Sequence, residues 1–298
     1  MNDLAPIVFF AYKRLDHARK SIEALQKNLL AGESDLIIFS DGPKDDSSRE
    51  QVVEVRKYLR TISGFRSVTI TEGTANAGLS GSIINGVTAV LKRYDKAIIL
   101  EDDLVTSPYF LKYMNDGLRG YENDARVASI HGYIYPVKKP LPETFFLQGA
   151  DCWGWATWKR AWDAFEADGT KLLRELDRRN LTHSFDLDGS FGYSHMLERQ
   201  VAGLTDSWAI RWHASAFLAD MLTLYPGTSL VDNIGQDSSG THKGAASYKY
   251  ESLENREIRV GGIPVEESRE ARSVIVDYFR SRRPSFMQKA KSAFKKLL

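Results

Sequence analysis

Apolar residues recur in short runs along the first hundred positions, and the first three runs are each followed by a longer stretch with helical spacing. The short runs lie at residues 7–10, 36–39, 68–70 and 97–100. The longer stretches, with apolar residues at three- and four-residue steps, lie at 15–25, 47–59 and 83–91. Short continuous apolar runs are typical of strands buried on both faces. Their alternation with helices predicts an α/β protein with a mostly parallel sheet and helices on both faces.

Polar residues collect directly after these predicted strands, at residues 12–14, 40–42, 71–78 and 101–103. In a parallel sheet, ligands bind outside the carboxyl ends of the strands, so we expect a site there. The last segment is Glu101, Asp102 and Asp103. Three carboxylates at the exit of a buried strand are costly without a cation, and oxygen ligands suit Mg²⁺ or Mn²⁺. The alternative is an acidic turn that caps a helix beginning near Ser107.

The segment of residues 97–113 carries a resemblance to a known family. It reads Ala-Ile-Ile-Leu-Glu-Asp-Asp-Leu, and the helix predicted after it opens with Ser-Pro-Tyr-Phe-Leu-Lys-Tyr. After a β-α-β-α-β half, this order resembles the GT-A glycosyltransferases, which have a Rossmann-like fold. Within them it is closest to N-acetylglucosaminyltransferase I and to bacterial family 2-like sugar transferases. The resemblance implies an inverting enzyme that uses Mn²⁺ or Mg²⁺ to move a sugar from a nucleotide diphosphate sugar, with UDP favoured, to an acceptor hydroxyl.

The resemblance also implies how the chain is divided. Residues 1–126 form the nucleotide-sugar-binding half, and 127–247 form the acceptor-side half of the same domain. Residues 248–298 are a C-terminal extension with a basic amphipathic tail. The acceptor side is expected in the second part, where glycine, aromatic residues and histidine are common without a clear period.

The metal site implied by the resemblance centres on the acidic triplet. Asp103 would bind the metal directly, Asp102 would contact the ribose or the donor sugar, and Glu101 would orient the pair within the metal site. A late histidine closes the metal site in several GT-A families, which makes His242 a candidate ligand. The N-acetylglucosaminyltransferase I pattern does not require this histidine.

The same resemblance assigns the nucleotide sugar to the ends of the first three strands. Arg14 can pair with a carboxylate or phosphate, and Asp41 can accept a hydrogen bond from a base N–H. Gly78 permits close backbone approach, and the helix that opens near Ser80 favours a phosphate at its N-terminus. The alternative for Asp41 is a role in a common Asp-Gly-Pro turn. The predicted contacts are Tyr12, Arg14, Asp41, Asn76, Gly78 and Ser80.

Tryptophans cluster between residues 153 and 162. Trp155, Trp158 and Trp162 have helical spacing, which favours a role in the core. Trp153 and Gly154 are the candidates for sugar contact, because indole faces stack on sugar C–H groups and glycine lets a ring approach the backbone.

An inverting transfer needs a carboxylate base near the acceptor hydroxyl. Asp206 is preferred because the family resembles this chain in carrying an Asp beside a Trp in this region. Glu198 is the second candidate. The alternatives are a helix cap for Asp206 and an ion pair on a helix surface for Glu198.

Overall charge and cysteine content narrow the setting. The 40 Lys and Arg nearly balance the 39 Asp and Glu, so the net charge of the chain does not indicate nucleic acid as a partner. The single cysteine, Cys152, excludes an internal disulfide and suits a reducing compartment. Neither a signal-peptide pattern nor an apolar run of membrane-spanning length is present. We therefore expect a cytoplasmic protein.

The C-terminal tail modifies this expectation. Residues 284–298 combine apolar residues at three- and four-residue steps with four lysines and no acid, which is typical of a basic amphipathic helix. Such a helix predicts peripheral attachment to an anionic membrane surface, beside a lipid-linked glycan acceptor in cell-surface glycan assembly. A helix docked on the protein core, or a solvated tail, is the alternative.

Two other functions remain open at this stage. A sugar nucleotidyltransferase shares the fold, but it usually has a glycine-rich phosphate loop after the first strand. The residues after Ile7 are Phe-Phe-Ala-Tyr-Lys-Arg, without glycine. A non-catalytic carbohydrate-binding protein is the other alternative, and the intact Glu-Asp-Asp sequence argues against it.

Overall fold

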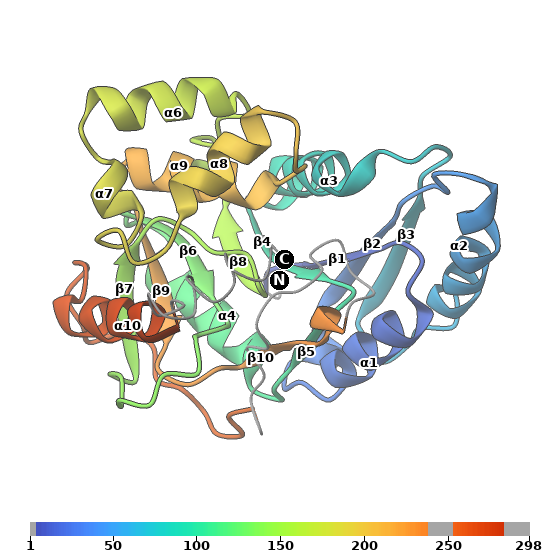
Figure 1. The fold of residues 1–298 in the computed structure, drawn as a ribbon. Coiled ribbons are helices and arrows are strands. Elements are labelled where there is room, and N and C mark those ends of the chain that lie inside the picture. The colour runs from blue at the N-terminus through green and yellow to red at the C-terminus, as the bar shows by residue number, and fades with distance from the viewer. Residues whose placement is uncertain (1–3, 238–252, 283–298) are drawn as a thin grey trace, which may run out of the picture.

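A sheet of eight strands with helices on both faces forms the centre of the computed structural model, which describes residues 4–237 and 253–282 (Figure 1). The strands lie in the order β3-β2-β1-β4-β8-β6-β9-β7. Their bounds are β1 (Ile7–Ala11), β2 (Asp35–Ser40), β3 (Ser67–Glu72), β4 (Lys96–Glu101), β6 (Val127–His131), β7 (Thr144–Gln148), β8 (Trp155–Trp158) and β9 (Leu222–Pro226). A second sheet pairs β5 (Leu104–Thr106) with β10 (Val231–Asn233).

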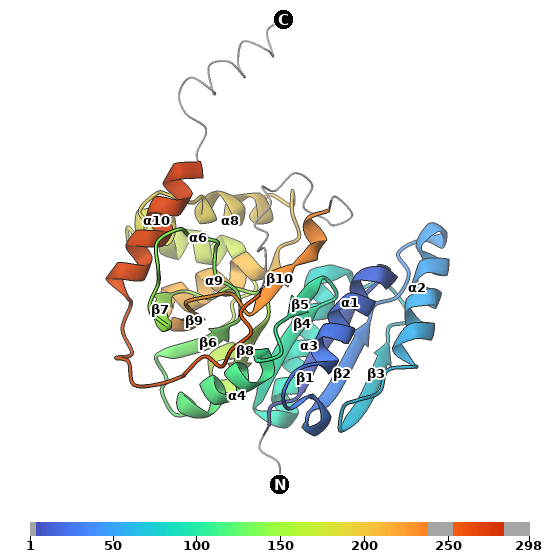
Figure 2. The same ribbon diagram turned by 90° about the horizontal axis from the view of Figure 1, so that it is seen from below.

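Helices occupy most of the described connections. The α-helices are α1 (Leu15–Gln26), α2 (Asp46–Leu59), α3 (Gly78–Tyr94), α4 (Phe110–Gly120), α5 (Lys159–Trp162), α6 (Gly169–Arg178), α7 (Thr182–Phe185), α8 (Tyr193–Val201), α9 (Trp208–Leu218) and α10 (Arg269–Arg282). Two short 3₁₀ helices are η1 (Ala31–Glu33) and η2 (Ile234–Gln236). The views show α1 and α4 on one face of the large sheet and α3 and α9 on the other (Figures 1 and 2).

The sheet is mostly parallel, as the sequence predicts. Strands β1 to β4, β6 and β9 run in one direction, whereas β7 and β8 run against their neighbours. All four predicted N-terminal strands and the helices between them are present. Because parallel strands end at the same edge, this topology brings the segments after β1, β2, β3 and β4 together.

The tryptophan cluster takes a different local structure from the one its spacing suggests. Trp155 and Trp158 begin and end strand β8, and only Trp162 lies in a helix. All three are no more than 5% exposed, so the predicted core role is confirmed while the helical interpretation is wrong. A strand of four residues places its first and last side chains on opposite faces, and here both faces are covered.

The helix after the acidic triplet begins later than Ser107 and Pro108 suggest. The N-cap of α4 is Tyr109, and it makes no side-chain cap hydrogen bond. Ser107 Oγ accepts from the Tyr109 backbone N–H at 3.1 Å, so this serine shapes the turn before the helix.

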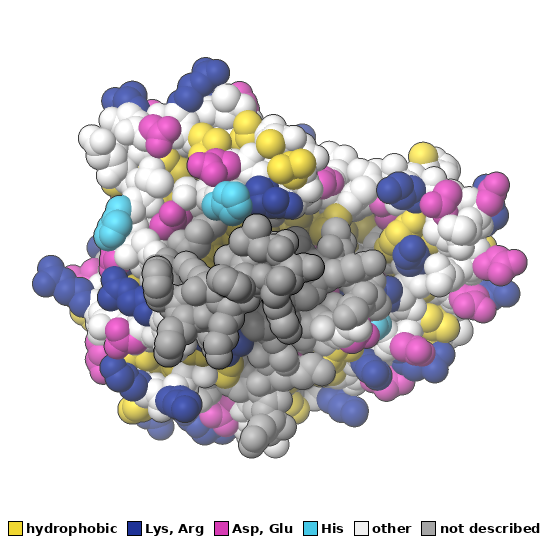
Figure 3. Space-filling view, viewed as in Figure 1, with side chains coloured by type: hydrophobic (Ala, Val, Ile, Leu, Met, Phe, Trp, Pro, Cys, Tyr) yellow, Lys and Arg dark blue, Asp and Glu magenta, His cyan; other side chains and the backbone are white. Residues whose placement is uncertain are grey.

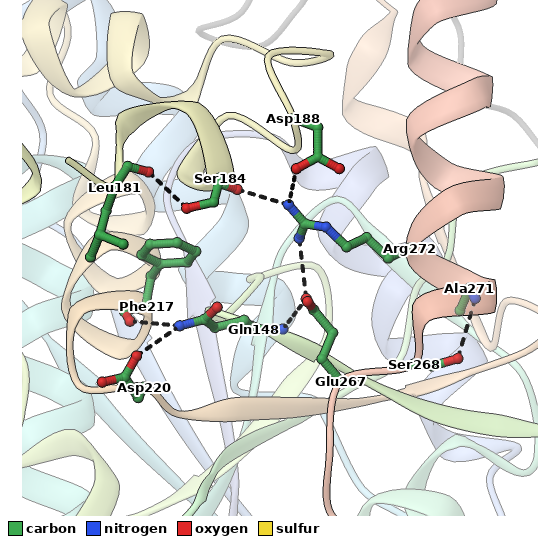
Figure 4. A network of polar contacts seen from close by, with 10 residues as sticks. All are labelled: Gln148, Leu181, Ser184, Asp188, Phe217, Asp220, Glu267, Ser268, Ala271 and Arg272. Atoms are coloured by element: carbon green, nitrogen blue, oxygen red, sulfur yellow. Dashed lines mark hydrogen bonds and ion pairs between the residues drawn. The ribbon is translucent and has the colours of Figure 1, made fainter. Parts of the chain in front are cut away.

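Helix α10 packs against the second half of the chain through an apolar face that includes Ile275 and Phe279. Figure 4 shows the polar network beside it. Arg272 donates to Asp188 at 2.9 Å and to Glu267 Oε1 at 3.2 Å, and Glu267 accepts from the Gln148 backbone N–H. These contacts join α10 to β7 and to the loop after α7. The predicted boundaries near residues 127 and 248 remain predictions.

The face of the molecule shown in Figure 3 is mixed in charge. Acidic and basic side chains are interspersed over the face shown in Figure 3, as expected for a chain whose net charge is +1. Within the described ranges, every helix is too short or too polar to cross a membrane.

Candidate active site at the carboxyl edge of the sheet

Arg14 links the end of β1 to the acidic triplet after β4. Its Nη2 donates to Asp103 Oδ2 at 2.7 Å and also to Asp102 Oδ1. Asp102 is 4% exposed and additionally accepts a hydrogen bond from the Tyr12 backbone. One guanidinium therefore bridges two carboxylates at the point where strands β1 and β4 end side by side.

This arrangement shifts the pKa values of Arg14, Asp102 and Glu101. Burial raises the pKa of Asp102 to about 6 against the opposing charge of Arg14, and Asp103 adds to the rise. Burial also raises the pKa of Glu101 to about 8, with contributions from Asp103 and Asp102. Burial works against the charge on Arg14, but the two aspartates outweigh it and raise its pKa. Near neutral pH, Glu101 is therefore mainly protonated and Arg14 stays charged.

Asp41, at the end of β2, organises the loop that leads into α3. Its Oδ1 accepts from the backbone N–H groups of Gly42 (2.8 Å) and Ala77 (2.9 Å). Its Oδ2 accepts from Asn76 Nδ2 (3.0 Å) and the Gly78 N–H (3.1 Å). A carboxylate has about four acceptor positions, so Asp41 would contact a base only by giving up one of these bonds.

The loop before α3 also meets Asp206. The Ser80 hydroxyl donates to the Asp206 backbone carbonyl at 3.2 Å. Gly78 has φ +73°, and a Cβ built on it would lie 3.7 Å from Asp206 Oδ2. Ser207 is the N-cap of α9, so Asp206 is not the cap and its side chain is 64% exposed. The structure thus brings together Asp206, the preferred base, and two of the predicted donor contacts, Gly78 and Ser80, which lie more than a hundred positions earlier in the sequence.

Asp103 is held from its other side by the segment after β10. Its backbone carbonyl accepts from the Ile234 N–H at 2.9 Å. A Cβ built on Gly235 would lie 2.1 Å from Asp103 Oδ2, which only glycine avoids. Strand pairing of β10 with β5 sets this contact, because Asn233 is opposite Leu104.

The donor set at this edge fits a divalent cation bound through one protein carboxylate. Burial raises the pKa of Glu101, and Asp102, with its side chain 6% exposed, accepts from both Arg14 and the Tyr12 backbone. Arg14 also donates to Asp103. Asp103, with its side chain 16% exposed, remains the accessible carboxylate. Mg²⁺ commonly takes one or two carboxylates and completes its shell with water and substrate phosphates. No group of three or more His, Cys, Asp or Glu able to hold a metal occurs among the described residues.

The remaining predicted site residues have different settings. Glu198 lies on the exposed side of α8, 3.3 Å from His195 Nδ1. Trp153 is partly exposed, and its ring packs against Tyr133 with centroids 4.7 Å apart. Gly154 is buried, and a Cβ there would lie 2.8 Å from Val231 Cγ2, so this glycine allows close packing, and its sugar contact stays a prediction. His242 lies outside the described residues.

Sequence reasoning missed a cavity of about 170 Å³ next to this edge. It is lined by residues of the segment 131–135, the segment 150–153 and helices α8 and α9, among them Asp151, His131 and His213. The signal was present, because Asp151 directly precedes the tryptophan-rich segment, where a carboxylate beside aromatic rings is typical of a binding site.

Comparison with known proteins gives the following. No family model matches the chain, and no curated protein matches it. The mannosyltransferase PcManGT from Pyrobaculum calidifontis, solved with GDP-Man and Mn²⁺, aligns at 12% identity and TM-score 0.33, covering 44% of this chain and 36% of that one. TarS 1-349 from S. aureus aligns at 12% identity and TM-score 0.34, covering 58% and 49%. The matched part therefore spans less than half of the length of PcManGT and of TarS 1-349. The functional assignment rests on this chain's own residues.

Proposed function

We propose that the protein is a metal-dependent glycosyltransferase that moves a sugar from a nucleotide diphosphate sugar to an acceptor hydroxyl. The observation that carries the proposal is the meeting, at one sheet edge, of the Arg14–Asp102–Asp103 cluster, the loop of residues 76–80 and the exposed carboxylate of Asp206. The sequence resemblance favours UDP as the nucleotide and inversion at the anomeric carbon.

For the nucleotide sugar, the residues provide charged side chains and backbone N–H groups. Asp103 would hold a Mn²⁺ or Mg²⁺ ion, which would neutralise the departing diphosphate. Arg14, which pairs with Asp103 at 2.7 Å, would add a second positive charge beside the same phosphates. Asp41 fixes the loop before α3, whose N-terminus favours an anion.

On the acceptor side, Asp206 is the preferred base. Its exposed carboxylate lies beside Gly78, at the entrance to the donor loop, where a hydroxyl could approach the anomeric carbon. Proton transfer to this carboxylate would accompany bond formation to the anomeric carbon and departure of the nucleoside diphosphate. Glu198, paired with His195 on the surface of α8, is the second candidate.

A turnover screen tests the proposal. The full chain would be incubated with Mn²⁺ and each of UDP-glucose, UDP-galactose, UDP-N-acetylglucosamine and GDP-mannose, and release of nucleoside diphosphate would be followed. We expect release from at least one donor, dependent on Mn²⁺. Release of pyrophosphate from a nucleoside triphosphate and a sugar phosphate would instead indicate a nucleotidyltransferase. Binding of sugars without turnover of any donor would indicate a carbohydrate-binding protein.

We further propose that residues 284–298, which lie outside the described residues, attach the enzyme to anionic membrane and so place it near a lipid-linked acceptor. The support is the sequence alone, in which Lys289, Lys291, Lys295 and Lys296 flank an apolar stripe. Each cation near an anionic leaflet adds about 1 kcal/mol. Co-sedimentation with phosphatidylserine vesicles should be lost when 284–298 are deleted, and equal pelleting of both forms would refute the attachment.

A further inference from the structure

The cavity beside the acidic edge has a wall of aromatic rings. Tyr133 packs edge-on against Trp153 with centroids 4.7 Å apart, and Phe191 contacts Tyr193 at 4.6 Å. The volume of about 170 Å³ is close to that of a cavity of about 150 Å³ that holds one benzene ring. The space therefore suits a single six-membered ring with an apolar face.

Asp151 is the charged group of this cavity. Its Oδ2 accepts from the Tyr225 hydroxyl at 3.0 Å, and no Lys or Arg of the described chain forms an ion pair with it. Burial lowers the pKa of His131 to about 4 and also lowers that of His213, so both neighbouring imidazoles are neutral at pH 7. A carboxylate has about four acceptor positions, and Tyr225 uses one of them here, so the partly exposed Asp151 suits a ligand that donates hydrogen bonds.

The cavity is lined by residues that neighbour the proposed active site. Ala209 and Ile210 line it from the first turn of α9, directly after Asp206. Cys152 also lines it, and burial together with the nearby carboxyl groups of Glu101, Asp151 and Asp103 raises the pKa of its thiol. A ring in the cavity would thus lie near the acidic strand end, through Cys152, and near the start of α9, which follows Asp206.

We propose that this cavity binds the terminal sugar ring of the acceptor, with Asp151 accepting a hydrogen bond from a ring hydroxyl. Aromatic rings stack on the C–H face of a pyranose, while the carboxylate selects an orientation. That the bound sugar is the acceptor rests on the proposed function. Binding of a sugar in the cavity can be measured without turnover. Under the proposed function, the donor nucleotide would bind at the ends of β1, β2 and β3.

Saturation-transfer NMR with methyl glycosides of glucose, galactose and N-acetylglucosamine tests the proposal, with choline as a cationic probe. We expect at least one glycoside to bind and Asp151→Asn to weaken it about tenfold or more, as for loss of a hydrogen bond to a charged group. Asp163→Asn, which changes an exposed carboxylate paired with Lys159, is the matched control and should bind like wild type. Calorimetric binding of UDP or GDP with Mn²⁺ should be the same in all three proteins.

The outcomes separate the two proposals. Nucleotide binding without any glycoside binding, or equal glycoside affinity in Asp151→Asn and wild type, overturns the cavity assignment and leaves the proposed function standing. Glycoside binding without nucleotide binding or turnover overturns the proposed function instead. Choline binding that excludes every glycoside would show a site for a cation, and parallel loss of nucleotide and glycoside affinity in Asp151→Asn would place the donor sugar there. Either of these results contradicts an acceptor-ring site.

Discussion

Replacing Arg14 with methionine should destabilise the protein strongly, because this guanidinium compensates two carboxylates that are largely buried. The side chains of Arg14, Asp102 and Asp103 are 22%, 6% and 16% exposed. Removing one partner of a buried ion pair typically costs about 3–5 kcal/mol, since the other charge stays desolvated. Arg60→Met is the matched control. Arg60 pairs with Glu72 at 2.7 Å, but the side chains are 59% and 28% exposed, and such pairs contribute about 0.2–1 kcal/mol.

The loss should also depend on pH in a defined direction. The pKa of Asp102 is raised from 3.8 to about 6 in the folded protein. A folded-state pKa above the unfolded value means that the stability contribution of Asp102 is present below about pH 4 and is lost as the pH rises through 6. Once Asp102 is protonated it no longer needs Arg14. The effect of Arg14→Met is therefore largest above pH 6 and shrinks as the pH falls toward 4.

Urea unfolding followed by tryptophan fluorescence at pH 7.5 and pH 5 measures both effects. We expect Arg14→Met to lower the free energy of unfolding by about 3–5 kcal/mol at pH 7.5 and by clearly less at pH 5, with an unchanged m-value. Arg14→Lys, which keeps the charge but not the forked donor, should recover part of the loss. A loss as small as that of Arg60→Met, or one that grows on acidification, would refute the electrostatic account of the cluster.

Three further changes have defined outcomes. Gly235→Ala should destabilise by about 1–3 kcal/mol and weaken Mn²⁺-dependent nucleotide binding, because its Cβ would lie 2.1 Å from Asp103 Oδ2; calorimetry with both readouts checks it. Asp206→Asn should lower turnover by about two to four orders of magnitude with little effect on donor binding. A larger loss of turnover in Glu198→Gln than in Asp206→Asn would make Glu198 the base instead. Burial lowers the pKa of His131 from 6.5 to about 4. The contribution of His131 to the free energy of unfolding, roughly 3 kcal/mol, is therefore fully present above pH 6.5 and is lost as the pH falls through 4. His131→Gln should remove that part of the acid loss in unfolding titrations.

Much of the first half of the fold was predictable because local and tertiary signals agree there. Buried parallel strands have continuous apolar runs, and each run is followed by a helix with regular spacing, as in Ile7–Ala11 and Leu15–Gln26. Past the acidic triplet, burial overrides periodicity. Trp155 and Trp158 are three residues apart, as on one face of a helix, yet they lie on a strand that is covered on both sides.

The location of the site in the fold was predictable from the sequence, but the contacts between its side chains were not. The sheet topology brings Arg14 and Asp103 to one edge, and the sequence pattern indicates that edge. Their direct pairing, and the use of Asp41 as an organiser of the loop before α3, depend on side-chain geometry that no spacing encodes. The same holds for the cavity at Asp151, because its lining comes from four separate segments of the chain.

Binding of UDP and GDP to wild-type protein and to Asp103→Asn, measured by calorimetry with Mn²⁺ and with EDTA, tests the central claim most directly. We predict that wild type binds at least one of these nucleotides only when Mn²⁺ is present. The Asp103→Asn variant, with an unchanged circular dichroism spectrum, should bind the same nucleotide at least about tenfold more weakly, because the accessible carboxylate of the site is lost. Failure of wild type to bind either nucleotide, or equal affinity in the variant, would contradict the account.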